Sequence, residues 1–526
     1  MTTSTRRPGV PRPRGLEHLG KPRGVLSPRV RAVGPEHFGV VCVDCAKARS
    51  KWMLTDFYGT VLVPPTFLDH RRDAFDHAIA QIGQAVAAHQ LRDLVVVVER
   101  TGRYHLPVKR AFTTAGYDVR VVHPMIARYF RQAAHPDQKT DDTDLEGIFQ
   151  AACNGYGLLE APWDPIYSEL QLWARYRRDL VHKSTLLCCQ ILEHLESCLP
   201  GYVRCFDNVF NSGIALVIPS AYPTPQAVTE AGLPGLIELA HREGVRVQEA
   251  TLIRILAWAG DAPQPDREAA LHVRLLGALN RDRITKEEDI QSIERELVSL
   301  VVQTPYVRLL APAGIHVVLA AELAGELGPI THYATGRVIT GRAGLFPRRY
   351  QSDRVDYRRG KLVRQGNRRL RQVLLLAAET LARCNHHFQV LVARWQSQGK
   401  DPRDSYVRVA GRLARITLQM VAGSSAFRHP ACQGPPAVLG KLMEFHNEHN
   451  INLTITRTNL QRAAAQLPGA EQARERAALE AKRTAARGRR GRGPKQLAAI
   501  LPAVLKQLLG GERADVIESN ESGESS

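Results

Sequence analysis

Four acidic side chains occupy positions that suit a metal-dependent active site. Asp44 ends a short apolar run, and Glu99 ends a second run that is rich in β-branched residues. Asp141 and Asp144 stand three residues apart in the segment KTDDTD, so both lie on one face of a helix that begins there. Carboxylate clusters of this kind hold two divalent ions about 3.5–4 Å apart in phosphodiester chemistry. Hard oxygen ligands favour Mg²⁺ or Mn²⁺ over zinc.

Each of these acids also has an ordinary structural interpretation. Asp141 and Asp144 would stabilise a helix N-terminus through the helix dipole. Glu99, followed by Thr101 and Gly102, would suit a simple exit from a strand into a turn. The combination of two strand-end acids with a later acidic pair, rather than any single acid, indicates a site.

The elements that would position these acids follow an α/β pattern. The strand-like runs lie at 37–44, 51–57, 60–63, 94–98 and 119–122, and helical spacing covers 74–89. Such alternation is typical of a sheet that is covered by helices. We therefore predict an α/β domain with the acids at the ends of its strands.

The remaining chain is expected to be mainly α-helical. The predicted segments are a disordered basic tail at 1–34, the α/β catalytic domain at 35–160, a helical and coiled-coil-like region at 161–303, a compact unit at 304–385, a helical extension at 386–470, and a basic then acidic, largely disordered tail at 471–526. Thr285 and Glu288 form a capping box, which predicts that a helix begins there and runs to about Val302. No function is predicted for residues 205–282 or for the extension after 385.

The charge of the chain favours a polyanionic partner. The sequence has 71 Lys and Arg against 52 Asp and Glu, a formal net charge of +19. Eleven Lys or Arg and two Asp fall between Arg342 and Arg371. No uninterrupted apolar run reaches the roughly 18–20 residues of a membrane-spanning helix, so we expect a cytoplasmic, nucleoid-associated protein without a membrane partner.

The nine cysteines show no pattern of paired spacing. Cys42 and Cys45 form a single CxxC motif, with no second cysteine pair and no histidine pair at zinc spacing. The motif lies in an apolar strand pattern, which favours buried structural thiols in a reducing compartment.

The neighbourhoods of the four acids resemble a known family. VCVDCAK (41–47), VVERTGRY (97–104), VVHPMIARYF (121–130) and KTDDTD (139–144) are similar to the DEDD-type transposases of the insertion-sequence-110 family. The resemblance implies an RNase H-like (RuvC-like) domain in which Asp44, Glu99, Asp141 and Asp144 are the catalytic, metal-binding acids. Asp142 stands where the family usually has Arg, and Leu145 stands where it usually has Ala.

A second resemblance covers part of the C-terminal half. Residues 309–323 resemble the helix-hairpin-helix opening of the family's transposase domain, although Ala313 and His316 replace the usual Pro and second Gly. Within 341–375, Gly344-Leu345-Phe346-Pro347, Gly366-Asn367 and Leu370-Arg371 match the family pattern.

The same resemblance implies that Ser352 is a nucleophile on DNA, although Asp353 replaces the usual Gly after it. A serine hydroxyl is a weak nucleophile that needs a base or a metal to take its proton. None is evident beside Ser352 in sequence, so the carboxylate cluster would have to supply that activation. The residues expected to bind nucleic acid are Arg348, Arg349, Arg358, Arg359, Lys361, Arg364, Asn367, Arg368, Arg369 and Arg371.

The expected function is that of a transposase or recombinase that cleaves and exchanges DNA strands. The resemblance also implies a non-coding bridge RNA as guide and a homo-dimer or tetramer. Two alternatives remain open from the sequence. One is a RuvC-like DNA junction nuclease that uses metal-activated water, and the other is a nucleic-acid-binding protein without catalysis.

Overall fold

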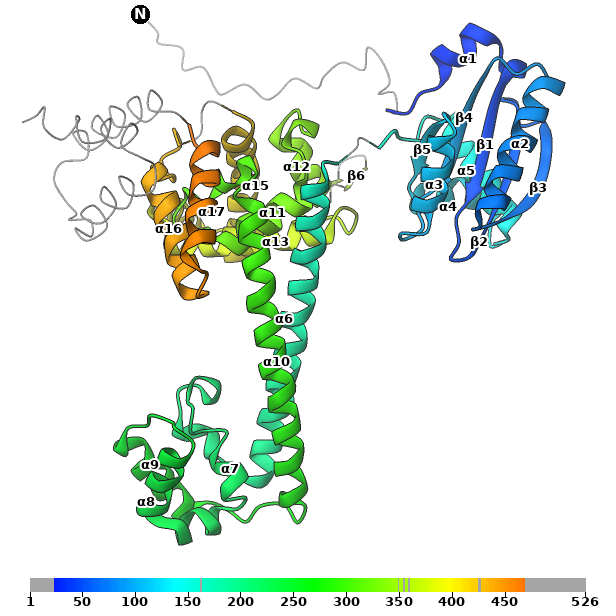
Figure 1. Ribbon diagram of the computed structural model, residues 1–526. Helices are drawn as coiled ribbons and strands as arrows, with labels where there is room; N and C mark the ends of the chain where they lie inside the picture. The colour runs from blue at the N-terminus through cyan, green and yellow to red at the C-terminus, as the bar shows by residue number, and fades with distance from the viewer. Residues whose placement is uncertain are drawn as a thin grey trace, which may run out of the picture. The chain divides into compact units, whose positions relative to one another are not determined.

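The computed structural model describes residues 23–160, 163–348, 350–352, 355–357, 360–423 and 427–468, with the backbone alone for the two three-residue segments. The chain divides into two compact units, one up to residue 162 and one from residue 163 onward (Figure 1). The predicted tail at 471–526 and residues 1–22 lie outside the described residues.

The first unit is built on a five-stranded mixed sheet. Its strands are β1 (Phe38–Asp44), β2 (Arg49–Thr55), β3 (Val61–Asp69), β4 (Asp93–Glu99) and β5 (Asp118–Val122), in the order β3-β2-β1-β4-β5. β1, β4 and β5 are parallel, while β2 and β3 run antiparallel to their neighbours. β4 contains the continuous valine run, as expected of a parallel strand that is buried on both faces.

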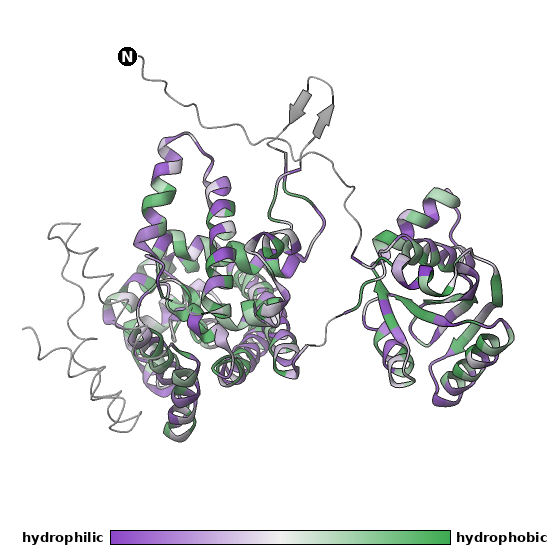
Figure 2. Cartoon of the chain, turned by 90° about the horizontal axis from the view of Figure 1, so that it is seen from above, coloured by the Kyte–Doolittle hydropathy of each residue, from purple (hydrophilic) through white to green (hydrophobic). Residues whose placement is uncertain are grey.

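Helices cover both faces of this sheet, which appears as an apolar layer in Figure 2. Val41 and Val43 pack with α2 (Arg72–Ala88) and α3 (His105–Thr114). Val40 and Cys42 point to the opposite face, as alternate residues of a strand must. They pack there with α1 (Ser27–Val33), α4 (Pro124–Ala134) and α5 (Asp141–Cys153). The α/β pattern predicted for residues 35–160 is therefore present.

Helix α1 corrects the prediction that residues 1–34 are disordered. Leu26 and Val30 are buried against the sheet, and their spacing of four residues places them on one helical face. Arg29 between them pairs with Asp93 and Asp118 at the first residues of β4 and β5. Because the apolar pair lies in an Arg- and Pro-rich segment, composition concealed it.

The second unit contains two long helices, α6 (Pro165–Cys198) and α10 (Ala269–Val301), which run side by side (Figure 1). The insertion between them, residues 199–268, has its own apolar core. It comprises the 3-10 helices Tyr202–Cys205 and Val209–Asn211 with α7 (Ile218–Ala221), α8 (Pro225–Arg242) and α9 (Glu249–Asp261). The predicted helix start at Thr285 is wrong, because this residue lies inside α10 and its hydroxyl donates to the carbonyl of Arg281.

The rest of the second unit packs around one buried helix, α11 (Val317–Leu327). The other elements are the 3-10 helices Pro305–Leu310 and Ile330–His332, α12 (Gly336–Ala343), β6 (Tyr350–Ser352), β7 (Val355–Tyr357), α13 (Arg368–Cys384), α14 (His386–Ser397), α15 (Pro402–Ala422), α16 (Pro435–Glu448) and α17 (Leu453–Gln466). One apolar core runs from Tyr167 to Ala463 and continues across residue 385.

The segment expected to form a helix-hairpin-helix has a different geometry. A 3-10 helix, not an α-helix, precedes the turn at Gly314. The ammonium group of Lys441 on α16 donates to the carbonyls of Leu310, Pro312 and Ile315 and so closes this turn. The family-like sequence thus forms a 3-10 helix, a turn and an α-helix. Among the described helices, none has the length and apolar character needed to cross a membrane.

Candidate active site

Asp44 and Glu99 lie at the same edge of the sheet. β1 and β4 are parallel neighbours, and Val43 stands opposite Val98 in their register. The next residue of each strand is the acid, so both carboxylates emerge side by side where the strands end. Both side chains are half-buried.

Helix α5 brings the other two predicted acids to this edge. Thr140 caps the helix, and it exchanges hydrogen bonds with Thr143 in a reciprocal capping arrangement. Asp141 and Asp144 therefore fall in the first turn of the helix. Leu145, which replaces the family's usual Ala, is fully buried in the core beneath them.

The acids of the two strand ends and of the α5 turn lie near enough to influence one another's charge. Burial raises the pKa of Asp44 to about 6, and the charges of Asp144 and Asp141 add to this effect. Burial likewise raises the pKa of Glu99 to about 7, assisted by Asp44 and Asp144. Lys139 opposes both shifts. The structure thus brings together the four acids that the sequence singled out.

Basic partners distinguish the acids of the α5 turn. Arg131 on α4 donates from Nη1 to Oδ1 of Asp144 over 2.7 Å, and its side chain is buried. Asp142, which replaces the family's usual Arg, turns instead to the Nζ of Lys51, 2.6 Å away. Sequence reasoning missed Arg131, and its only signal was a basic residue within an amphipathic helix.

The donor set fits a hard divalent cation, because all four side chains offer carboxylate oxygens. Within the part of the chain that the structure describes, no group of three or more His, Cys, Asp or Glu side chains is arranged to hold a metal ion. The chemistry of the site therefore suits a metal, while its side chains are not in the geometry of a formed ligand set.

The CxxC motif has a structural role. Cys42 and Cys45 are both buried, and burial raises the pKa of both thiols well above the ordinary value. Protonated thiols of this kind are poor metal ligands and poor nucleophiles.

The backbone at Ser352 belongs to a short hairpin in the second unit. Ser352 ends β6 and stands opposite Val355 of β7. Arg349, Arg358 and Arg359, together with Asp353, lie outside the described residues. The predicted nucleic-acid contacts that the structure shows as exposed are Arg348, Lys361, Arg364 and Arg368. Arg369 is partly exposed and lies 3.7 Å from Asp179 of α6.

Asn367 and Arg371, also predicted to contact nucleic acid, are held by protein partners. The Oδ1 of Asn367 accepts from the backbone amides of Arg369 and Leu370 and so caps α13. Its Nδ2 donates over 2.8 Å to the buried carboxylate of Glu326. These bonds give Asn367 a structural role at the start of α13, while its contact with nucleic acid stays a prediction.

Arg371 joins the two ends of the segment that contains the hairpin. Its Nε donates to the carbonyl of Ala343, and its Nη2 donates to the carbonyl of Gln365. Glu326 in turn receives two bonds from Arg175 on α6. We call Asn367, Arg371, Glu326 and Arg175 the loop clamp, because together they fix the segment 344–366 to α6 and α11.

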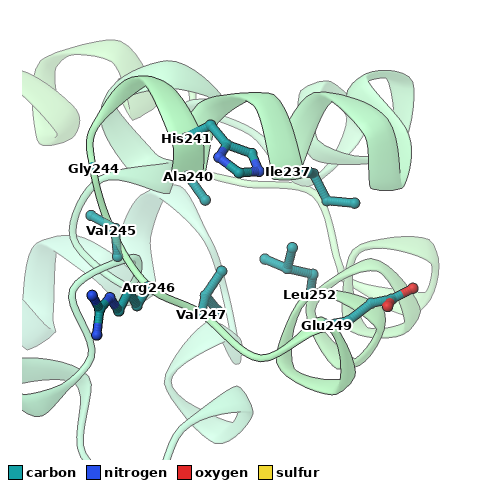
Figure 3. Close-up of a pocket in the computed structure, with 9 residues that line it drawn as sticks. All are labelled: Ile237, Ala240, His241, Gly244, Val245, Arg246, Val247, Glu249 and Leu252. Carbon is teal, nitrogen blue, oxygen red and sulfur yellow. The ribbon is translucent and has the colours of Figure 1, made fainter.

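A cavity of about 430 Å³ lies in the insertion between α8 and α9 (Figure 3). Ile237 and Leu252 give it apolar walls, while His241, Arg246 and Glu249 contribute polar groups. None of the sequence-predicted site residues lines it.

Comparisons with known proteins agree with this architecture. A family model described as a transposase of the DEDD insertion-sequence-110 type matches residues 41–200. A second model, for the transposase IS116/IS110/IS902 family, matches residues 307–393. A protein of Pseudomonas aeruginosa named "Probable family 20 transposase" is 24% identical over 379 residues, which is 70% of this chain and 98% of that relative.

The first match contains all four acids, and the second contains Ser352 and the loop clamp residues of α11 and α13. DEDD transposase domains have an RNase H-like fold, act on DNA and generally use divalent metal ions, which agrees with the mixed sheet and its carboxylate edge. Both matches are to transposases of the insertion-sequence-110 type, and together with the relative they show that the chain is a DNA transposase.

Proposed function

We propose that this transposase cleaves and exchanges DNA strands with Asp44, Glu99, Asp141 and Asp144 as metal ligands and Ser352 as the nucleophile. The main support for the metal site is that the acids at the ends of β1 and β4 lie beside the first turn of α5. Three separate elements supply these carboxylates to one edge of the sheet. An arrangement that only stabilised a helix N-terminus would not need the acids of β1 and β4.

The metal is Mg²⁺ or Mn²⁺ in this proposal. When bound, the ions supply an activated attacking oxygen and a stabilised leaving oxygen in phosphodiester chemistry. Arg131 orients Asp144 within the site, whereas Asp142 pairs with Lys51 and is not one of the ligands.

Ser352 supplies the covalent step. Its hydroxyl gives up its proton as Oγ attacks a DNA phosphorus. One Oγ–P bond forms as one P–O bond of the strand breaks, and the departing DNA oxygen takes up a proton in exchange. Attack by a DNA hydroxyl then reverses the linkage and joins the exchanged strands without net hydrolysis. The exposed side chains of Arg348, Lys361, Arg364 and Arg368 would bind the phosphates on either side.

A non-coding bridge RNA and a homo-dimer or tetramer complete the proposal. Both come from the family resemblance, and the large positive charge of the chain suits a complex with RNA and DNA together. The enzyme would act on element ends and target DNA in the cytoplasm.

The metal site is tested by matched carboxylate variants. Asp44→Asn and Glu99→Gln should each lower Mg²⁺-dependent cleavage of the element-end DNA by about a thousandfold or more, because each removes a ligand of the reacting centre. Asp142→Asn is the matched control, since Asp142 stands in the same turn as the ligands but pairs with Lys51. Its activity should stay close to that of the unaltered chain.

Two results would count against the proposal. Cleavage that persists in Asp44→Asn and Glu99→Gln would exclude these carboxylates as ligands of the reacting centre. Cleavage that needs both acids but survives in Ser352→Ala would favour a metal-dependent junction nuclease that uses water. Ser397→Ala is the control for loss of a serine, since that hydroxyl donates within its own helix.

A further inference from the structure

Helix α15 presents a basic face that the proposed chemistry does not use. Its buried residues, among them Val409, Leu413 and Met420, all lie on one side of the helix. Arg408, Arg412 and Arg415 follow at spacings of four and three residues, so they share the opposite face. Arg408 and Arg415 are exposed, and Arg412 is half-buried.

Two of these arginines are held by the same aromatic ring. The guanidinium carbons of Arg408 and Arg412 lie 5.8 Å and 5.2 Å from the centre of the Trp395 ring on α14. The ring itself is only 9% exposed, so it forms a fixed platform. Cation–π contacts of this kind hold each guanidinium in place. They also keep two like charges close together, which is unfavourable unless an anion is near.

No protein anion occupies that position. In the described ranges, no ion pair joins Arg408, Arg412 or Arg415 to a carboxylate, and Asp404, one turn before Arg408, makes none with it. The arginines of α6 behave differently, because Arg175, Arg177 and Arg178 all pair with buried glutamates. The α15 arginines are therefore fixed but uncompensated.

The third arginine extends this face toward the element that precedes the serine hairpin. A Cβ at Gly336, the first residue of α12, would lie 2.5 Å from Cγ of Arg415. Glycine at this position lets the stem of Arg415 lie directly over the start of α12. Helix α12 then leads into the segment that contains Ser352.

We propose that Arg408, Arg412 and Arg415 form a binding surface for the phosphate backbone of double-stranded DNA. The three side chains lie within eight consecutive residues, which rise about 10 Å along the helix. Duplex DNA presents one negative charge per about 1.7 Å of its axis, so several phosphates fall within that span. Guanidinium groups match phosphate oxygens with paired donors. The surface carries charge without groups placed to distinguish bases, so its binding is independent of sequence.

This proposal rests on DNA as the substrate but not on the serine or metal chemistry. It assigns a role to the helices after residue 393, where the match to the second family model ends. The surface would hold the flanking duplex while the hairpin segment acts on the strand.

The test measures the salt dependence of duplex binding by the full chain, with metal chelated so that no cleavage occurs. The double variant Arg408→Gln/Arg412→Gln should bind a DNA duplex more weakly at low salt. Its plot of log affinity against log salt should be less steep by about 1.8, because two phosphate contacts are lost. Arg408→Lys/Arg412→Lys should keep most of the slope, since it keeps both charges.

The matched control removes the same charge elsewhere. Arg246 and Arg254 are exposed arginines of the insertion, and neither makes an ion pair among the residues described. Arg246→Gln/Arg254→Gln should leave the salt slope unchanged. An unchanged slope in the α15 variant, or an equal change in the control, would overturn the proposal, provided that thermal unfolding shows both variants folded.

If the α15 double variant bound only an RNA duplex more weakly, with unchanged binding of the DNA duplex, the proposal would also be overturned, since the surface would then bind RNA. Failure of this test is distinguishable from failure of the proposed function. Ser352→Ala should retain duplex binding with an unaltered slope even though it loses strand exchange.

Discussion

Asp142 and Asp144 show how a single turn of helix assigns different roles to similar residues. The two acids are separated by one residue, yet Asp144 turns to the buried Arg131 and Asp142 turns to Lys51. The sequence predicted the acids from their places at strand ends and in a helical turn. It could not predict their partners, because Arg131 and Lys51 come from α4 and β2, which meet α5 only in the folded unit.

The pair of Arg131 and Asp144 carries a prediction at this scale. Arg131→Met leaves a largely buried carboxylate without its counter-charge, which should destabilise the first unit by about 3 kcal/mol. The loss should appear as faster hydrogen exchange of the α5 amides in the full chain. Adding Asp144→Asn should restore part of the protection, because it removes the uncompensated charge.

Arg128→Met provides a comparison, since this exposed arginine on the same helix has no ion-pair partner among the residues described. Its exchange rates should match those of the unaltered chain. Equal exchange rates in Arg131→Met and the unaltered chain would mean that the buried pair does not hold Asp144 in place.

At the scale of elements, the sequence predicted the sheet well and the long helices less well. Apolar runs placed β1, β4 and β5 within a residue, because burial on both faces leaves a strong signal. The run at 60–63 missed most of β3 (Val61–Asp69), whose side chains are largely exposed or half-buried. The start of α10 was misplaced, because a capping pattern at Thr285 occurs by chance inside a continuous helix. Helix α1 was missed because its apolar pair lies within a basic segment.

Asn367 illustrates a signal that was present but overlooked. Asparagine directly before a helical run is a strong N-cap, and that role accounts for its oxygen. Its bond to Glu326 could not be foreseen, since the two residues are 41 positions apart in the sequence and meet only in the folded chain.

The loop clamp leads to a prediction that uses compensation. Asn367→Asp should preserve the cap of α13 but place a carboxylate against that of Glu326, which repels it and disturbs the segment 344–366. Strand exchange should fall by about a hundredfold, as small misplacements of reacting groups do. Adding Glu326→Gln should recover much of this loss, because the new amide can donate to the introduced carboxylate.

Recovery in the double variant would show that Asn367→Asp acts by displacing the segment rather than by a general loss of stability. In Asn367→Asp itself, the kcat should change more than the KM for DNA. Asn452→Asp is the matched control, because Asn452 caps α17 without a buried acid beside it. If the double variant is no better than Asn367→Asp, the contact with Glu326 does not position the segment.

At the scale of the whole molecule, the chain distributes its chemistry over two compact units. The acids belong to the first unit, and Ser352, the loop clamp and the α15 arginines belong to the second. Sequence motifs identified the four acids and Ser352 because family patterns surround them, but they did not indicate Glu326 or Arg175 of the loop clamp. The α15 surface had no motif, and only the packing of α14 against α15 revealed it.

The most direct test of the central claim is whether DNA becomes covalently attached to Ser352. The full chain is incubated with its element-end DNA and Mg²⁺, denatured, digested with protease and analysed by mass spectrometry for a nucleotide-linked peptide. We predict an adduct on the peptide that contains Ser352, and none in Ser352→Ala or without divalent metal. Cleaved DNA with free ends and no adduct, or an adduct that persists in Ser352→Ala, would contradict the account.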